Sequence, residues 1–251
     1  MRLRAGVLGM AGLEWLTAQP IAHRGLHDST IGIVENTPSA VEAALSAGYG
    51  IEVDLQVTAD GDAVVHHDEV LGRLTDGRSR LDALTVAELK RVPFHDTTDR
   101  MLTLGELCDL VGGRAALLLE LKSRFDWNHR LAIRAYAVLD GYRGPAAVMS
   151  FDPYLIMWIS KVAPNLVRGI VAEKRVPRGV QWMGRVNYVR SITTARPRFV
   201  AYAVDDLPAV APLLARYVLG LPLLTWTVRD ERQRQLAKRW ADQMIFEGFR
   251  P

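Results

Sequence analysis

The sequence predicts an α/β protein that forms a closed TIM-type (β/α)8 barrel, and three observations support this prediction. The chain has 251 residues, which is typical of one α/β barrel domain. Short apolar runs alternate with helical patterns, and eight strand segments result. Polar side chains end most of these strands, at the rim where such barrels carry their chemistry.

The composition excludes several classes of protein. Apolar residues make up 49% of the chain and charged residues 24%, so we expect a folded globular protein. No apolar run reaches the roughly 18–20 residues of a membrane-spanning helix. The single cysteine, Cys108, excludes a disulfide framework and a cysteine-based zinc site.

Charge is distributed unevenly along the chain. Residues 1–125 carry 12 basic and 18 acidic side chains, whereas residues 126–251 carry 19 and 10. The acidic half therefore suits cations, and the basic half suits an anionic partner. The arginines are scattered without a basic–aromatic motif, so we expect no nucleic-acid partner.

The whole chain, 1–251, is expected to form a single domain in which residues 1–19 are a lead-in segment. Glu14 interrupts the apolar run that follows two arginines, and no small-x-small cleavage site follows. We therefore expect a cytoplasmic protein rather than a secreted one. The alternative is peripheral membrane contact through the apolar side chains of this segment, which are Val7, Leu8, Met10, Leu13 and Trp15.

The first strand–helix–strand unit is predicted between residues 20 and 57. A short strand at 20–25 ends in polar residues. A helix begins at Pro38 behind the expected N-cap Thr37 and ends at Gly48. The next strand, 50–57, alternates apolar with polar side chains.

A hairpin and an irregular segment come next. A turn at 59–62 joins the second strand to another apolar run at 63–65, which predicts a hairpin. Residues 73–100 are predicted to be a small insertion or lid after the second strand. It contains one short helix, 85–92, that begins with a capping box of Thr85 and Glu88.

From residue 103 onward, helices and strands alternate regularly. A helix at 103–111 ends at Gly112, and the apolar strand 115–122 is expected to be covered on both faces. The remaining strands are predicted at 146–150, 166–172, 199–204, 223–228 and 243–246. The helices among them are predicted at 128–139, 154–162, 180–191, 209–217 and 230–240.

Three carboxylates are candidate ligands for a cation. Glu52 and Asp54 are two residues apart in one strand and therefore share a face, and Glu120 lies near the end of another strand. Neighbouring carboxylates repel each other unless a cation or a proton lies between them. Carboxylate oxygens suit hard cations, so the sequence predicts one divalent cation, Mg²⁺ or Ca²⁺.

Two histidines and two cationic side chains accompany these carboxylates. His23 ends the first strand and His67 follows the hairpin, and imidazoles can serve as a general acid and a general base near neutral pH. Arg24 and Lys122 can hold an anionic substrate and offset charge that develops on it. The combination predicts cleavage of a phosphate ester.

The ordered motifs of the chain resemble those of the glycerophosphodiester phosphodiesterase family, over about residues 20–247. They are HRG at 23–25, ENT at 35–37, ExD at 52–54, ADG at 59–61, HD at 67–68, ELK at 120–122 and a Trp-Thr pair at 226–227. The chain departs from the family pattern at Val34, where proline is usual, at Arg229, where asparagine is common, and at Phe246-Glu247, where threonine-aspartate is usual. These departures concern the choice of substrate more than the chemistry.

The resemblance implies a TIM barrel with a small insertion after the second strand. It implies cation-aided hydrolysis of glycerophosphodiesters to sn-glycerol 3-phosphate and an alcohol. The roles it implies are acid/base catalysis by His23 and His67, metal binding by Glu52, Asp54 and Glu120, substrate contacts by Arg24, Lys122 and Trp226, and support from Glu35, Asn36 and Asp68. Similar enzymes suggest attack by the substrate's own hydroxyl with a cyclic phosphate intermediate, and direct attack by water stays open.

Two alternatives for the function stay open. A lysophospholipase D would use the same site with a lipid substrate, and would need an apolar ramp. The residues that could build the ramp are Phe125, Trp127, Phe151, Tyr154, Met157, Trp158 and Trp182. A non-catalytic barrel that binds phosphodiesters is the second alternative, and the pair of histidines argues against it because a binding protein does not need both.

Overall fold

The computed structural model describes residues 12–174 and 194–251. The strands are β1 (Ile21–Ala22), β2 (Gly50–Val57), β3 (Ala63–Val65), β4 (Leu117–Leu121), β5 (Ala146–Ser150), β6 (Val167–Ala172), β7 (Phe199–Ala203), β8 (Leu223–Val228) and β9 (Gln243–Phe246). The α-helices are α1 (Glu14–Thr17), α2 (Pro38–Ser46), α3 (Val86–Leu89), α4 (Leu104–Val111), α5 (Arg130–Leu139), α6 (Pro153–Val162), α8 (Val210–Tyr217) and α9 (Glu231–Trp240). Short 3-10 helices are η1 (Ser29–Ile31), η2 (Leu81–Ala83) and η4 (Val204–Asp206).

These strands form one sheet in the order β1-β9-β8-β7-β6-β5-β4-β2-β3, and a further pairing of β1 with β2 closes it. The strand β3 is the returning arm of a hairpin and pairs antiparallel with β2. The other eight strands are the parallel strands of a closed barrel with flanking helices, so the predicted fold class is confirmed. The helix predicted at 180–191 lies outside the described residues.

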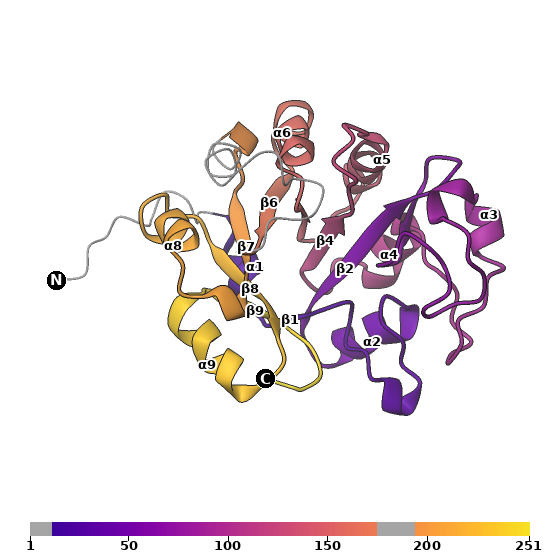
Figure 1. The fold of residues 1–251 in the computed structure, drawn as a ribbon, viewed down its shortest axis with the longest axis horizontal. Coiled ribbons are helices and arrows are strands. Elements are labelled where there is room, and N and C mark those ends of the chain that lie inside the picture. The colour runs from indigo at the N-terminus through magenta and orange to yellow at the C-terminus, as the bar shows by residue number, and fades with distance from the viewer. Residues whose placement is uncertain (1–11, 175–193) are drawn as a thin grey trace. The chain divides into compact units, whose positions relative to one another are not determined.

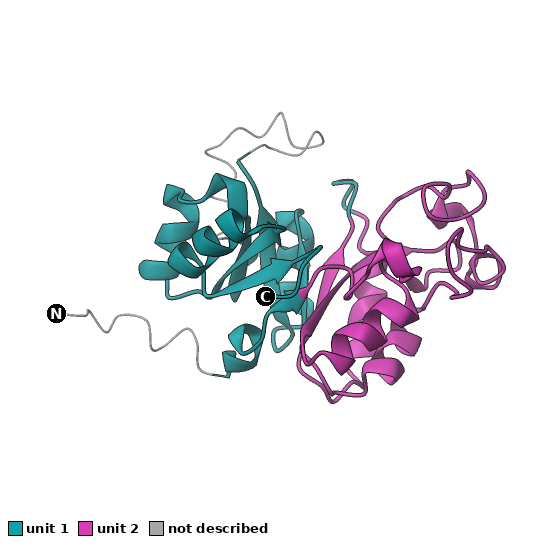
Figure 2. Cartoon of the chain, turned by 90° about the horizontal axis from the view of Figure 1, so that it is seen from below, with its two compact units in different colours: residues 1–21, 123–127, 147–251 teal, residues 22–122, 128–146 magenta. Residues whose placement is uncertain are grey.

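The chain divides into two compact units, which Figure 2 colours separately. The unit that carries the predicted metal ligands comprises residues 22–122 and 128–146. In it β2 and β4 run parallel and side by side, with Asp54 opposite Glu120 (Figure 1). Seven of the eight residues of β2 are buried, because the strand has a neighbour on each edge and is covered on both faces.

Residues 73–100 contribute to a small hydrophobic cluster within this unit, together with side chains from the hairpin and from the loop before α2. Its buried members are Val34, Val64, Leu71, Leu81, Leu89, Phe94 and Met101. The helix α3 begins with the predicted capping box, in which Thr85 accepts from the backbone N–H of Glu88 and the Glu88 carboxylate accepts from Thr85. The segment is therefore packed and capped, and its action as a lid stays a prediction.

The second unit comprises residues 1–21, 123–127 and 147–251 and holds the parallel strands from β6 to β9 together with most of β5. Two of its helices, α6 and α9, begin at acidic caps, since Asp152 accepts from the first turn of α6 and Asp230 from the first turn of α9. Gly169 in β6 permits close packing, because a Cβ there would lie 2.3 Å from the ring of Phe199.

Thr37 is the N-cap of α2, as predicted, but its hydroxyl donates to the carbonyl of Val34, at 2.8 Å, and accepts no hydrogen bond from the first turn of the helix. The loop before the helix thereby gains a buried hydrogen bond, and Pro38, which has no N–H, leaves one fewer donor to cap. The first strand ends at Ala22 rather than Gly25, because Arg24 and Gly25 have left-handed backbone conformations.

None of the helices in residues 12–174 and 194–251 is both long and apolar enough to cross a membrane.

Candidate metal centre

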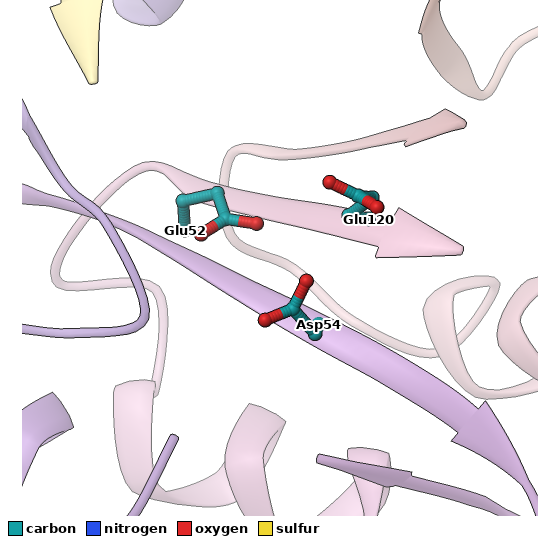
Figure 3. Close-up of side chains that lie close together, drawn as sticks. All are labelled: Glu52, Asp54 and Glu120. Atoms are coloured by element: carbon teal, nitrogen blue, oxygen red, sulfur yellow. The ribbon is translucent and has the colours of Figure 1, made fainter. Parts of the chain in front are cut away.

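Three buried carboxylates meet on the neighbouring strands β2 and β4. Glu52 and Asp54 come from β2 and Glu120 from β4, and the parallel register places Asp54 opposite Glu120. One carboxylate oxygen of each residue lies within 4.8 Å of the other two, and Figure 3 shows the carboxylate groups facing a common space. Glu52 and Asp54 are each 1% exposed. The geometry therefore brings together the three residues predicted as metal ligands.

The charges in this cluster are unequally compensated. Burial raises the pKa of Glu52 well above its ordinary value, and the negative charges of Asp54 and Glu120 raise it further. For Asp54, burial also acts to raise the pKa, but Lys122 and Arg24 outweigh it and hold the pKa below the ordinary value. Asp54 is thus stabilised as an anion, whereas Glu52 lacks a sufficient positive partner.

One oxygen of Glu52 points to what would complete the cluster. Its Oε1 is buried and accepts no hydrogen bond from the described residues, whereas Oε2 accepts the backbone N–H of Arg24 at 3.0 Å. A buried carboxylate oxygen without a partner is unfavourable. Three hard oxygen donors around a common space fit a divalent cation such as Mg²⁺ or Ca²⁺.

Two cationic side chains flank the carboxylates. Lys122 Nζ lies 2.7 Å from Asp54 Oδ1 and 2.6 Å from Glu120 Oε1. Burial would lower the pKa of Lys122, but Glu120 and Asp54 outweigh it and raise the pKa above its ordinary value. Arg24 Nε lies 3.2 Å from Asp54 Oδ2, an ion pair without the alignment of a hydrogen bond, and Nη1 donates to Glu35 at 2.7 Å. Both cations remain charged at neutral pH.

The backbone around Arg24 explains how these groups are held. Arg24 and Asn36 both have left-handed conformations, with φ of 57° and 59°, and the N–H of Asn36 donates to the carbonyl of Arg24. The Asn36 side chain donates to Asp54 Oδ2 and accepts from the Asp54 N–H. Gly25 is required beside them, because a Cβ there would lie 2.8 Å from Ala40. Asn36 therefore fixes Asp54, and its supporting role in the site stays a prediction.

Both predicted histidines lie near this cluster. His23 Nε2 is 3.9 Å from Glu52 Oε2, and the backbone N–H of His66, next to His67, donates to the carbonyl of Asp54 at 3.0 Å. His67 Nδ1 is 2.7 Å from Asp68 Oδ1, so the carboxylate of Asp68 can orient the imidazole. The side chain of His67 is 33% exposed, which leaves it accessible to a substrate.

His66, the neighbour of His67, has a structural position. It is 1% exposed, it lies against Phe94, and its Nδ1 has no hydrogen-bond partner in the described part of the chain. Burial lowers the pKa of His66 from 6.5 to about 4. The fold therefore holds this imidazole neutral.

This burial predicts a sensitivity of the fold to acid. As the pH falls below 6.5, the unfolded chain binds a proton at His66 that the folded chain does not bind until about pH 4. Wild type should therefore lose about 2 kcal/mol more stability than His66→Leu between pH 7 and pH 5. Urea unfolding at both pH values measures the difference. Equal losses in the two proteins would contradict the prediction.

One residue of this site was missed from the sequence. Arg73 donates to Glu35 and to Asp68, the two carboxylates that contact Arg24 and His67. Arg73 lies in an irregular segment without hydrophobic periodicity, and nothing in its spacing indicated which carboxylates it would reach. Its position follows from the packing of that segment.

The predicted aromatic residues lie in the second unit. Trp226 in β8 packs edge to face against Phe151, with ring centres 5.5 Å apart, and its Nε1 is buried without a partner in the described residues. Trp127 is 59% exposed and packs against Tyr154 at 4.2 Å. Trp182 lies outside the described residues.

Comparison with known proteins identifies relatives of this chain. The model of the Glycerophosphoryl diester phosphodiesterase family matches residues 23–249. A glycerophosphodiester phosphodiesterase of Caldanaerobacter subterraneus subsp. tengcongensis is 33% identical over an alignment of 163 residues that covers 61% of this chain and 66% of that protein. Glycerophosphodiester phosphodiesterase 1 of Bos taurus is 43% identical over 74 residues, 29% of this chain and 21% of that protein. The matches thus span less than two thirds of these relatives' lengths.

A solved structure supports the fold over almost the whole chain. A phosphodiesterase of Oleispira antarctica, determined in complex with its product sn-glycerol 3-phosphate, superposes with a TM-score of 0.77. The alignment covers 92% of this chain and 94% of that one, at 22% sequence identity. At this identity the likeness concerns the fold.

Proposed function

The chain belongs to the glycerophosphoryl diester phosphodiesterase family, and from this premise we propose that it hydrolyses glycerophosphodiesters to sn-glycerol 3-phosphate and an alcohol with the aid of one divalent cation. The observation that supports the proposal is the group of three buried carboxylates on β2 and β4, flanked by two cations and two imidazoles. The related phosphodiesterase of Oleispira antarctica holds sn-glycerol 3-phosphate, which is the product expected here.

Glu52, Asp54 and Glu120 would hold the cation in this proposal. Their oxygens are hard donors, they share one space, and the free Oε1 of Glu52 would gain a positive partner. A bound cation would act as a Lewis acid on the phosphoryl group and lower the cost of the charge that develops there. Both Mg²⁺ and Ca²⁺ fit these three carboxylate ligands. The proposal also includes a cytoplasmic location for the protein.

The side chains around the carboxylates would bind the phosphodiester and move protons. Arg24 and Lys122 are held by Asp54, Glu35 and Glu120 and offer positive charge to the substrate anion. His23 and His67 would act as general acid and base: one accepts the proton of the attacking hydroxyl, and the other donates a proton to the departing alcohol oxygen. The P–O bond to the alcohol breaks as a new P–O bond forms, and water supplies the net hydroxyl and proton.

A second candidate is cleavage of lysophospholipids at the same site. Trp127 follows Lys122 by five residues, is 59% exposed and stacks on Tyr154. Exposed aromatic rings of this kind can contact an apolar chain. This observation favours a lipid-tailed substrate, and the assay that tests the proposal therefore includes one.

A release assay over a panel of diesters tests the proposal. Purified chain with Mg²⁺ or Ca²⁺ is expected to release sn-glycerol 3-phosphate from glycerophosphocholine and glycerophosphoethanolamine, and to lose this activity with excess chelator. Long-chain lysophosphatidylcholine serves as the lipid arm of the panel. Turnover of that lipid alone would replace the small-substrate function with the lysophospholipase function. Inertness toward every diester would favour a non-catalytic binding barrel.

A further inference from the structure

Arg73 is the one residue that joins the supports of His67 and Arg24 within the described part of the chain. Its Nε donates to Asp68 Oδ2 at 2.5 Å, and its Nη2 donates to Glu35 Oε1 at 2.6 Å. A longer hydrogen bond of 3.3 Å runs from Nη1 to Glu35 Oε2, so both terminal nitrogens of the guanidinium donate to the Glu35 carboxylate. A planar guanidinium can make these contacts at once because its donors have a fixed geometry.

Each carboxylate held by Arg73 has a second partner among the proposed functional residues. Asp68 Oδ1 lies 2.7 Å from His67 Nδ1, and Glu35 Oε1 lies 2.7 Å from Arg24 Nη1. Arg24 in turn lies 3.2 Å from Asp54. A continuous series of polar contacts therefore runs from His67 through Asp68, Arg73 and Glu35 to Arg24.

The charge of Arg73 also keeps these two carboxylates ionised. Burial acts to raise the pKa of Glu35 and of Asp68, but hydrogen bonds from Arg73 and from their other partners outweigh burial and lower both values. Without Arg73, the contacts within the described residues would leave Glu35 paired with Arg24 and Asp68 paired with His67 alone. An ionised Asp68 is what can accept the Nδ1–H of His67 and fix its orientation.

The backbone that carries Arg73 is itself held in place. Leu71 is 5% exposed in the small hydrophobic cluster, and Thr75, two residues after Arg73, is fully buried and forms a β-bridge with Phe94. Gly72 makes the close turn between Leu71 and Arg73, since a Cβ there would lie 2.9 Å from the carbonyl oxygen of Gly77. The packing of residues 71–94 therefore orients the guanidinium of Arg73 toward Glu35 and Asp68.

We propose that Arg73 is a positioning residue, which orients His67 through Asp68 and Arg24 through Glu35 for the reaction. This inference rests on the proposed function. It assigns a role to the segment after the hairpin: the segment supplies the side chain that joins an imidazole and a phosphate-binding cation into one fixed unit.

The test compares Arg73→Gln and Arg73→Lys with a control, Arg80→Gln. Arg80 lies in the same segment, pairs with Glu69 and Asp82, and is 42% exposed, close to the 46% of Arg73. With glycerophosphocholine and a saturating divalent cation, Arg73→Gln should lose about 10- to 100-fold in kcat. Arg73→Lys should retain part of that activity, because an ammonium can contact one of the two carboxylates. Arg80→Gln should match wild type, and all three variants should keep similar Tm values.

A double-mutant cycle separates positioning from a loss of structure. Replacement of Asp68 by asparagine removes the link to His67 but keeps the link through Glu35 to Arg24, so Arg73→Gln should cost less in an Asp68→Asn background than in wild type. If the losses in kcat of the two single variants simply multiply in the double variant, the inference is overturned. A loss in kcat of Arg73→Gln that accompanies a drop in Tm not seen in Arg80→Gln would also overturn it. So would an Arg73→Gln variant as active as wild type. Wild type that cleaves no diester would instead refute the proposed function on which the inference rests.

Discussion

Asp54→Asn is expected to reduce turnover of glycerophosphocholine by about a thousandfold. Asp54 is the centre of the site, since it contacts Arg24, Lys122 and Asn36 and lies opposite Glu120 on the next strand. Asparagine keeps the shape of the side chain but removes the charge that would hold a cation and restrain both cationic side chains. Initial rates of sn-glycerol 3-phosphate release, at several Mg²⁺ concentrations, measure the loss.

The matched control for this variant is Asp62→Asn. Asp62 lies in the turn of the same hairpin, outside the carboxylate cluster, where it forms an ion pair with Arg134 at 2.8 Å. Its replacement should leave turnover within about twofold of wild type, because a partly exposed surface ion pair of this kind contributes about 1 kcal/mol or less to stability. Activity in Asp54→Asn equal to that of Asp62→Asn would exclude Asp54 from the site.

His67→Ala is expected to lower kcat by about 100- to 10,000-fold, the range typical of a lost general acid or base. The imidazole is held by Asp68 at 2.7 Å and remains partly exposed, so its removal takes away a positioned proton-transfer group without opening the core. KM should change much less than kcat, because Arg24 and Lys122 stay in place to bind the phosphate. Steady-state kinetics with glycerophosphocholine gives both constants.

His95→Ala is the control for the loss of an imidazole. His95 also lies beside a carboxylate, 3.4 Å from Asp76, but it is exposed and has no contact with the cluster. Its removal should leave the kinetics unchanged. Turnover in His67→Ala at the wild-type rate would refute the proposed acid/base role.

Patterns that depend on neighbours in the sequence predicted much of the fold. The strands β5, β8 and β9 begin and end where predicted, because each is an apolar run bounded by turn-forming or polar residues. The capping box of α3 and the end of α4 at Gly112 were also predicted correctly, since both depend on residues within one or two helical turns. Thr37 is the predicted N-cap of α2, but its hydroxyl donates to the carbonyl of Val34, three residues earlier, and does not accept from the first turn of the helix.

Sequence patterns indicated which residues could form the site, but they did not indicate how those residues are arranged in space. A period of two places Glu52 and Asp54 on one face of a strand, yet only the pairing of β2 with β4 places Glu120 beside them. The predicted hairpin is confirmed, and His67 lies two residues after its second strand, β3. The contacts of Arg73 with Glu35 and Asp68 span 38 and five residues, and they depend on packing that no local pattern encodes.

The binding of one divalent cation by Glu52, Asp54 and Glu120 is the central claim, and calorimetric titration tests it most directly. Chelator-treated wild type, titrated with Mg²⁺ and in a second experiment with Ca²⁺, should show one saturable site per chain for at least one of these cations. Asp54→Asn should show that site weakened or lost, while Asp62→Asn should bind as wild type does. Wild type without saturable binding of either cation, or Asp54→Asn with undiminished affinity, would contradict the account.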